Sequence, residues 1–212
     1  MKIALINENS QASKNALIYK SLKNVADEKG YEVINFGMFS DNDKNSITYV
    51  QAGILAAILL NSNVVDYVVT GCGTGEGAML AANSFPNVIC GHIVDPSDAY
   101  MFSQINNGNA IAIPFAKGFG WGAELNLEYI FEKLFCEESG KGYPKERAIP
   151  EQMNKKILDE VKNVTYVDFL TILKNLDKEL LKGSISSDIF KEYFFKNCKN
   201  NEICEYLKSI LE

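Results

Sequence analysis

The chain has 212 residues, of which 47% are hydrophobic and 23% charged, an ordinary composition for a soluble globular protein. Its net charge of −6 argues against a nucleic-acid-binding or anionic-membrane surface, and no apolar run is long enough to cross a membrane. The five cysteines are odd in number and scattered, so neither a disulfide framework nor a zinc site is expected. The chain starts directly with a strand-like run and shows no signal-peptide pattern, so we expect a cytoplasmic protein.

Five units of a strand followed by a helix take up the chain as far as residue 135. Short apolar runs predict strands at residues 2–7, 32–37, 64–69, 87–93 and 110–114. Capping residues and apolar stripes predict helices from Ser13 to about Lys29, Ser46 to about Leu60, Ala78 onward, Pro96 to about Gln104 and Trp121 to Phe135. This alternation predicts an α/β fold, Rossmann-like in three α/β/α layers, with a five-stranded parallel sheet. A ligand site in such a sheet lies beyond the carboxyl ends of the strands.

The last third of the chain has a different pattern. A Gly- and Ser-containing linker or arm at residues 139–144 precedes it, and amphipathic helices are predicted at about 151–163, 165–181 and 186–211, the last with a break near residues 197–201. We therefore expect a Rossmann-like domain at residues 1–148 and an α-helical C-terminal extension at residues 149–212. No catalytic constellation is found in the extension.

The segment Thr70-Gly71-Cys72-Gly73-Thr74-Gly75-Glu76-Gly77 joins the third predicted strand to the next helix. A glycine at every second position bares the backbone N–H groups and permits a positive φ. Such a loop running into a helix N-terminus is an anion cradle, and the positive end of the helix dipole favours the thiolate form of a cysteine within it. The loop therefore offers a base or nucleophile together with donors for a developing oxyanion.

Two simpler interpretations stand beside this one. The glycines alone are typical of a tight turn, and a free cysteine is usually a small buried core residue. The segment is not a phosphate-binding P-loop, because no Lys-Ser/Thr pair follows, and it is a poor dinucleotide fingerprint, because it follows the third strand. The position of Cys72 inside the loop, rather than within the strand, favours function.

His92 and Arg147 are the only histidine and the only arginine. Chemistry that needs two histidines is excluded, and a bidentate arginine contact with a phosphate or carboxylate must use Arg147 of this subunit or of a neighbour. His92, at a strand end, is either an acid, base or phosphate donor or a structural residue. Asn106 and Asn107 precede the fifth strand. They either form a turn, which Asn favours, or supply amide groups that bind sugar hydroxyls.

The block Cys72-Gly73-Thr74-Gly75-x-Gly77, continued by Ala81-Ala82-Asn83, resembles that of the type B ribose-5-phosphate isomerases and the related galactose-6-phosphate isomerase subunits. The resemblance extends from Lys2 to about Arg147 and leaves the C-terminal extension outside the common core. It implies an aldose–ketose isomerase of a sugar phosphate, of the ribose-5-phosphate/ribulose-5-phosphate type or a related pentose or hexose phosphate. It also implies that no metal and no cofactor is required.

The resemblance implies a role for each residue of the block. Cys72 would move a proton between C1 and C2 of an open-chain substrate through a cis-enediolate, while the hydroxyl of Thr74 and the N–H groups around Gly73, Gly75 and Gly77 hold the enediolate oxygens. The site would lie at the interface of a homodimer or dimer of dimers, and Arg147 would reach it from the partner's C-terminal arm. A thiolate base with preorganised donors agrees with the physical interpretation of the loop.

Several positions depart from the family pattern. The family's Asp-His pair in the first loop is Glu8-Asn9 here, its ring-opening histidine is Ile105, and its first arm arginine is Tyr143. We expect Glu8 as a further catalytic group, with Glu8 or His92 as the candidate for ring opening. The residues expected to bind substrate are Asn9, Gly73, Gly75, Gly77, His92, Asn106, Asn107 and Arg147. Because ring opening and phosphate binding are both weakened, the substrate is either a sugar phosphate or a sugar or sugar acid that needs no ring opening.

Two other functions stay open. The chain could be a non-catalytic regulatory module that binds a sugar phosphate, with the C-terminal helices as a partner surface. It could also be one subunit of a hetero-oligomer whose missing residues come from a paralogous chain. In each case the ligand is a small sugar or sugar phosphate, and neither nucleic acid nor membrane is a partner.

Overall fold

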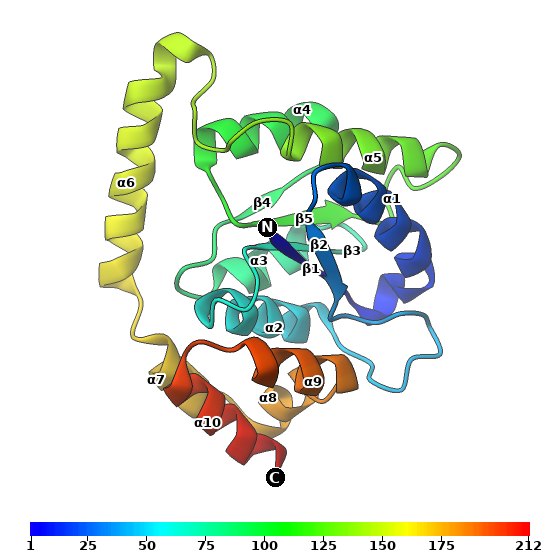
Figure 1. The fold of residues 1–212 in the computed structure, drawn as a ribbon, viewed down its shortest axis with the longest axis vertical. Helices are drawn as coiled ribbons and strands as arrows, with labels where there is room; N and C mark the ends of the chain where they lie inside the picture. Colours follow the sequence, from blue (N-terminus) through cyan, green and yellow to red (C-terminus); the bar gives the residue numbers. More distant parts are fainter.

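The computed structural model describes residues 1–212 and contains one parallel sheet (Figure 1). Its strands are β1 (Lys2–Asn7), β2 (Glu32–Asn35), β3 (Tyr67–Cys72), β4 (Cys90–His92) and β5 (Ala110–Pro114). They are hydrogen-bonded in the order β2-β1-β3-β5-β4, and all four pairings are parallel. The predicted Rossmann-like α/β/α fold is therefore confirmed.

Alternating side chains of the strands separate the core into two halves. Ile3 and Leu5 of β1 pack with helices α1 (Asn15–Glu28) and α5 (Ala123–Leu134), whereas Ala4 and Ile6 pack with α2 (Tyr49–Asn61) and α3 (Glu76–Asn83). Helix α4 (Pro96–Met101) lies beside α5 on the first face (Figure 1). Covering both faces with helices buries the near-continuous apolar strands of a parallel sheet.

The C-terminal helices add a further layer outside α2 (Figure 1). They are α7 (Phe169–Asn175), α8 (Lys178–Ser184), α9 (Asp188–Asn197) and α10 (Asn201–Leu211). Leu181, Phe190 and Leu207 belong to the same hydrophobic cluster as the residues of α2, in which every residue from Ala52 to Leu59 is buried. A helix that is apolar all round is stable only when it is covered on both sides, which explains why α2 lacks a polar face.

Helix α6 (Ala148–Thr165) stands apart from these layers, at the left of Figure 1. None of its residues is buried. Its exposed apolar side chains include Ile149, Met153, Ile157 and Val161, which recur every fourth residue and so share one face of the helix. In a single chain this apolar face of α6 is therefore exposed and packs against nothing.

The third strand lies three residues later than its prediction at 64–69. Pairing with β1 in the register Ile3↔Tyr67 to Asn7↔Gly71 sets its limits, and the buried Val64 and Val65 belong to the preceding turn. Cys72 is consequently the last residue of β3, opposite Pro114, and its predicted place inside the loop was wrong. The fourth strand is also shorter than predicted, because only Cys90–His92 pair with β5.

Several helix starts differ from their predictions because side chains elsewhere cap them. Glu8 caps a 3₁₀ helix, η1 (Asn9–Lys14), which runs directly into α1, so Ser13 is not a cap. Thr48, not Ser46, caps α2 in a capping box with Gln51. Asp177 caps α8, which divides the helix expected at 165–181. The break near residues 197–201 and the start of α4 at Pro96 were predicted correctly.

None of the helices combines the length and apolar content that crossing a membrane requires.

Candidate active site

Cys72 and Glu8 lie at the carboxyl ends of the neighbouring strands β3 and β1, at equivalent positions of the register. Asn7 is paired with Gly71, and Glu8 and Cys72 are the next residues along β1 and β3. Because side chains alternate along a strand, both fall on the same face of the sheet. Cys72 is 8% exposed and Glu8 only 2%. A thiol and a buried carboxyl group therefore share one corner of the fold.

Of the glycines after Cys72, Gly75 is the one that the geometry of the loop requires. Gly75 is the N-cap of α3 and has a φ of +79°, and a Cβ at this position would lie 2.8 Å from the imidazole of His92. A Cβ on Gly77 would lie 3.3 Å from the ring of Tyr49. A side chain therefore does not fit at Gly75, whereas one at Gly77 would be in tight contact with the Tyr49 ring.

His92, at the end of β4, contacts the same loop. Its Nε2 lies 2.8 Å from the carbonyl oxygen of Thr74. A carbonyl oxygen only accepts hydrogen bonds, so Nε2 carries a proton and donates it. The one imidazole of the chain is therefore committed to the backbone of the loop, and in the neutral ring only Nδ1 stays available as an acceptor.

A hydrogen-bonded series of polar side chains lies beside the loop, where Gln11 Nε2 is 3.8 Å from the ideal Cβ position of Gly73. The hydroxyl of Ser10 donates to Glu8 Oε1 at 2.6 Å, and the backbone N–H of Ser10 donates to Glu8 Oε2 at 3.0 Å. Gln11 Nε2 donates to the Ser10 hydroxyl at 3.2 Å, and Lys14 Nζ donates to Gln11 Oε1 at 2.8 Å. This hydrogen-bonded series therefore begins at the carboxylate of Glu8 and ends at the ammonium group of Lys14.

Lys14 also connects this series to the strand beside Cys72. Its Nζ donates to the carbonyl oxygen of Phe115 and lies 4.6 Å from the centroid of the Phe119 ring. The N–H of Phe115 donates to the carbonyl oxygen of Cys72 at 2.9 Å, and the N–H of Ala116 donates to that of Gly73 at 2.9 Å. The backbone around Cys72 is therefore held by the two residues that follow β5.

The remaining expected residues of this edge are more open. Thr74 is exposed and Gly73 half-buried. Asn9 is exposed at the start of η1, and its N–H donates to the carbonyl oxygen of Ile47 at 2.8 Å. The structure therefore brings Cys72, Glu8, Asn9, the glycine loop and His92 to one edge of the sheet.

Asn106, Asn107 and Arg147 lie elsewhere in the chain. The two asparagines end a short π-helix (Phe102–Asn106) and precede the amino end of β5, whereas Cys72 lies opposite the carboxyl end of that strand. The length of a five-residue strand, about 16 Å, therefore separates the two groups. Arg147 is exposed in η3 (Lys145–Arg147), which leads into α6. One chain by itself does not bring these three residues to Cys72.

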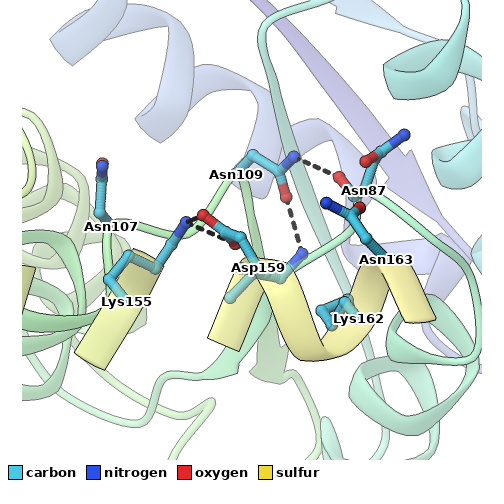
Figure 2. Close-up of a pocket in the computed structure, with 8 residues that line it drawn as sticks. Asn87, Asn107, Asn109, Lys155, Asp159, Lys162 and Asn163 are labelled. Atoms are coloured by element: carbon cyan, nitrogen blue, oxygen red, sulfur yellow. Dashed lines mark hydrogen bonds and ion pairs between the residues drawn. The ribbon is translucent and has the colours of Figure 1, made fainter. Parts of the chain in front are cut away.

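A polar pocket of about 400 Å³ lies at this amino edge, between α6 and the ends of the strands (Figure 2). Its lining residues are Asn87, Ile89, Asn107, Asn109, Lys155, Asp159, Lys162 and Asn163. Cys72, Glu8 and His92 do not line it, so this pocket is separate from the reactive groups.

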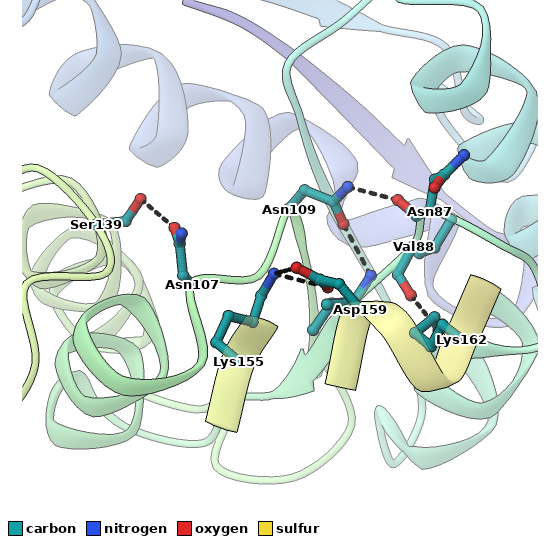
Figure 3. A network of polar contacts seen from close by, with 9 residues as sticks. Asn87, Val88, Asn107, Asn109, Ser139, Lys155, Asp159 and Lys162 are labelled. Atoms are coloured by element: carbon teal, nitrogen blue, oxygen red, sulfur yellow. Dashed lines mark hydrogen bonds and ion pairs between the residues drawn. The ribbon is translucent and has the colours of Figure 1, made fainter. Parts of the chain in front are cut away.

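The polar groups of this pocket mostly bind one another (Figure 3). Asn109 accepts a hydrogen bond from the N–H of Ile89 at 2.9 Å and donates to the carbonyl oxygen of Asn87 at 2.7 Å. Lys155 pairs with Asp159 at 2.7 Å, and Lys162 donates to the carbonyl oxygen of Val88 at 2.8 Å. Burial lowers the pKa of Lys162. These contacts hold α6 against the amino edge of the sheet and leave few polar groups free to bind a ligand.

Gln11 and Lys14 were not predicted as site residues. In the sequence they belong to a polar run that is typical of a turn, and only the 3₁₀ helix brings both side chains over the carboxyl edge. Their spacing of three residues directly after a strand end is the signal that could have identified them.

Comparisons with known proteins agree with one another. The family model described as Ribose/Galactose Isomerase matches residues 3–141, and a second model, described as Ribose-5-phosphate isomerase, matches residues 164–210. A crystal structure of a 4-deoxy-L-threo-5-hexosulose-uronate ketol-isomerase in complex with a tartrate is 64% identical, with a TM-score of 0.98 over 100% of this chain and 99% of that one. A ribose-5-phosphate isomerase from Vibrio parahaemolyticus is 53% identical, with a TM-score of 0.97 over 100% of this chain and 99% of that one.

More distant structures share the fold. A ribose 5-phosphate isomerase from Thermotoga maritima is 23% identical, with a TM-score of 0.58 over 75% of this chain and 97% of that one. None of the curated proteins matches the chain.

Proposed function

Because the chain belongs to the ribose/galactose isomerase family, we propose that it interconverts the aldose and ketose forms of an open-chain sugar acid, of the 4-deoxy-5-hexosulose-uronate type. The resemblance expected from the Cys72 loop is confirmed by this membership. The expected sugar-phosphate substrate is kept as a second candidate, because the 53% identical relative is described as a ribose-5-phosphate isomerase.

One observation carries the choice of substrate. The only imidazole of the chain donates from Nε2 to the backbone of the loop, and the place of the family's ring-opening histidine is taken by Ile105. A group that transfers a proton to and from a ring oxygen is therefore scarce at this site. A substrate that reacts from an open-chain form does not need one, and the 64% identical relative is described as the isomerase of a hexosulose-uronate.

The reaction proceeds by proton transfer. The thiolate of Cys72 removes the proton from C2 of the aldose, and the electrons of that C–H bond move toward the C1 carbonyl to form a cis-enediolate. The proton of the C2 hydroxyl moves to O1, and the proton held by Cys72, or one exchanged with water, returns to C1, so that C2 becomes the carbonyl carbon of the ketose. The first N–H groups of α3 have no partner within the helix, and in the proposed mechanism they hold the enediolate oxygens together with the hydroxyl of Thr74.

Glu8 stays a proposed proton-transfer group. Its carboxylate meets the hydroxyl of Ser10 at 2.6 Å and is almost fully buried, so a proton from substrate would reach it through that hydroxyl. Asn9 and Nδ1 of His92 are the proposed substrate contacts at the rim of the same corner.

A second copy of the chain completes the proposed site. Asn106 and Asn107 lie at the opposite edge of the sheet from Cys72, and Arg147 directly precedes α6, which packs on the π-helix at that opposite edge, so we infer that all three reach a substrate at Cys72 from a partner. The unpartnered apolar face of α6, which follows Arg147 directly, supports such an association. In this arrangement Arg147 pairs with the distal carboxylate or phosphate of the substrate.

The substrate is tested by following isomerisation by NMR with 4-deoxy-5-hexosulose uronate and with ribose 5-phosphate at equal concentration. We expect kcat/KM to be at least tenfold higher for the uronate. A preference for ribose 5-phosphate would reverse the order of the two candidates. Turnover of neither substrate, together with ligand stabilisation, would favour the regulatory module.

A further inference from the structure

Gln11 is the centre of a hydrogen-bonded chain whose direction is fixed by its two ends. Glu8 accepts at one end, because its carboxylate also receives the backbone N–H of Ser10, and Lys14 can only donate at the other. The Ser10 hydroxyl therefore donates to Glu8 and accepts from Gln11. This leaves one possible orientation for the Gln11 amide, with Oε1 toward Lys14 and Nε2 toward Ser10.

The amide so oriented has one hydrogen to spare. Nε2 carries two N–H groups, of which one donates to Ser10 at 3.2 Å, and the structure gives the second no acceptor in the protein. The side chain is half-buried, so this donor is partly open to solvent. Two ionic ends hold it in place, which lowers the entropic cost of using it as a donor.

The spare donor lies beside the reactive loop. A Cβ built on Gly73 would be 3.8 Å from Gln11 Nε2, and Gly73 directly follows Cys72. On the other side of Gln11, Asn7 Nδ2 donates to its carbonyl oxygen at 2.9 Å, and Asn7 is opposite Gly71 in the sheet. The absence of a side chain on Gly73 leaves space between the Gln11 amide and the loop.

We propose that Gln11 is a substrate-contacting residue, whose free Nε2–H donates to the enediolate oxygen that lies next to the Gly73 side of the loop. The inference rests on the isomerase function proposed above and adds to it a side-chain donor from η1, beside the N–H groups of the loop itself. Lys14, Ser10 and Glu8 act as positioning residues that fix the amide. Because Oε1 accepts from an ammonium group, the N–H groups of the amide are also polarised and become stronger donors.

The test uses isosteric variants. Gln11→Glu replaces the donor by an acceptor, and Gln11→Met removes the donor while keeping the length of the side chain. Gln51→Glu is the matched control, since Gln51 caps α2 with an oxygen that glutamate keeps and its amide faces Gly183 of α8. Circular dichroism and the melting temperature establish that each variant is folded.

We expect Gln11→Glu and Gln11→Met each to lower kcat about 10- to 100-fold, because one donor to the transition-state oxygen is lost. The kcat of Gln51→Glu should stay within about twofold of that of the unaltered protein. Lys14→Met should also lower kcat without abolishing activity, because Gln11 keeps its donor and loses only the group that positions it. Folded Gln11 variants with unchanged kcat would overturn the proposal.

A binding measurement separates this proposal from the function on which it rests. Erythronohydroxamate, whose planar cis oxygens imitate an enediolate, is titrated into ¹⁵N-labelled protein, and the side-chain amide signals that Gln11→Met removes are followed. A shift of these signals on binding supports the role of Gln11. Binding without any shift overturns the role of Gln11 alone. Failure of the hydroxamate to bind, together with turnover of neither sugar, overturns the isomerase function and the role of Gln11 with it.

Discussion

The imidazole of His92 is bound to the loop beside Cys72, with its Nε2 2.8 Å from the carbonyl oxygen of Thr74. The contact joins β4 to the loop between β3 and α3 across the carboxyl edge of the sheet. It also determines the tautomer, because the carbonyl oxygen requires a proton on Nε2. His92 therefore shapes the loop, and any contact with substrate has to come from Nδ1.

The role of His92 can be tested by substitution. In His92→Gln the side-chain amide keeps a donor near the position of Nε2, so we expect the loop to stay in place and kcat to fall less than about tenfold. His92→Ala removes the donor and leaves space beside Gly75, and we expect a fall of at least about 100-fold. Steady-state kinetics on both variants measures this. Equal losses in the two variants would show that the imidazole itself, not the donor, is required.

Gly75 should be intolerant of even one methyl group. Gly75→Ala imposes a left-handed φ of +79° on alanine and places Cβ 2.8 Å from the His92 ring, which should cost about 1–3 kcal/mol of unfolding free energy and most of the activity. Gly30→Ala is the control, because Gly30 has a φ of +66° but no atom within 4 Å of its Cβ position. Urea denaturation and kinetics compare the two. Equal activity in both variants would contradict the assigned packing of the loop.

A site shared between two copies predicts complementation. Cys72→Ala and Arg147→Ala should each be inactive alone, because each removes one half of every site. After the two are unfolded together and refolded, half of the dimers are mixed and each mixed dimer has one intact site, so about a quarter of the activity should return. The control mixes Cys72→Ala with Cys72→Ser, which should restore nothing. Mixed dimers seen by native mass spectrometry but without activity would show that the site belongs to one chain.

Cys90 gives a prediction about alkaline pH. Burial raises the pKa of its thiol from 9.0 to about 12, so the folded protein holds the proton at pH values where the unfolded chain loses it. The stabilising contribution is complete below pH 9 and is lost as the pH rises from about 9 toward 12, at up to about 1.4 kcal/mol per pH unit. Urea denaturation at pH 8, 9 and 10 measures this loss, and Cys90→Ala should show a smaller one. An identical pH dependence in the variant would contradict the assignment.

Much of the fold could be predicted from the sequence because it depends on local patterns. The apolar run before Cys72 and the glycines after it indicate a strand and a turn without knowledge of the rest of the chain. The limits of that strand could not be predicted, since they are set by pairing with β1, about 60 residues away in the sequence. The assignment of Cys72 to a loop was wrong for this reason.

The edge of the sheet at which the candidate site residues meet could be predicted in part for a similar reason. Cys72 and His92 end their strands and Glu8 directly follows one, and in a parallel sheet all such ends meet at one edge. Gln11 and Lys14 are brought there by a 3₁₀ turn that begins at the Glu8 cap, a feature that propensity does not reveal. Asn106, Asn107 and Arg147 are consistent with a site only when a second chain is considered, which no pattern within one sequence contains.

Proton exchange at Cys72 tests the central claim most directly. Turnover is followed by ¹H NMR in deuterated water with the unaltered protein and with Cys72→Ala, and binding of erythronohydroxamate confirms that the variant still forms the site. The proposed mechanism predicts deuterium at C1 of the ketose in the unaltered protein, and a loss of both isomerisation and exchange by at least about 100-fold in Cys72→Ala. Exchange at C1 or C2 that persists at the original rate in folded Cys72→Ala would contradict the assignment of Cys72 as the base.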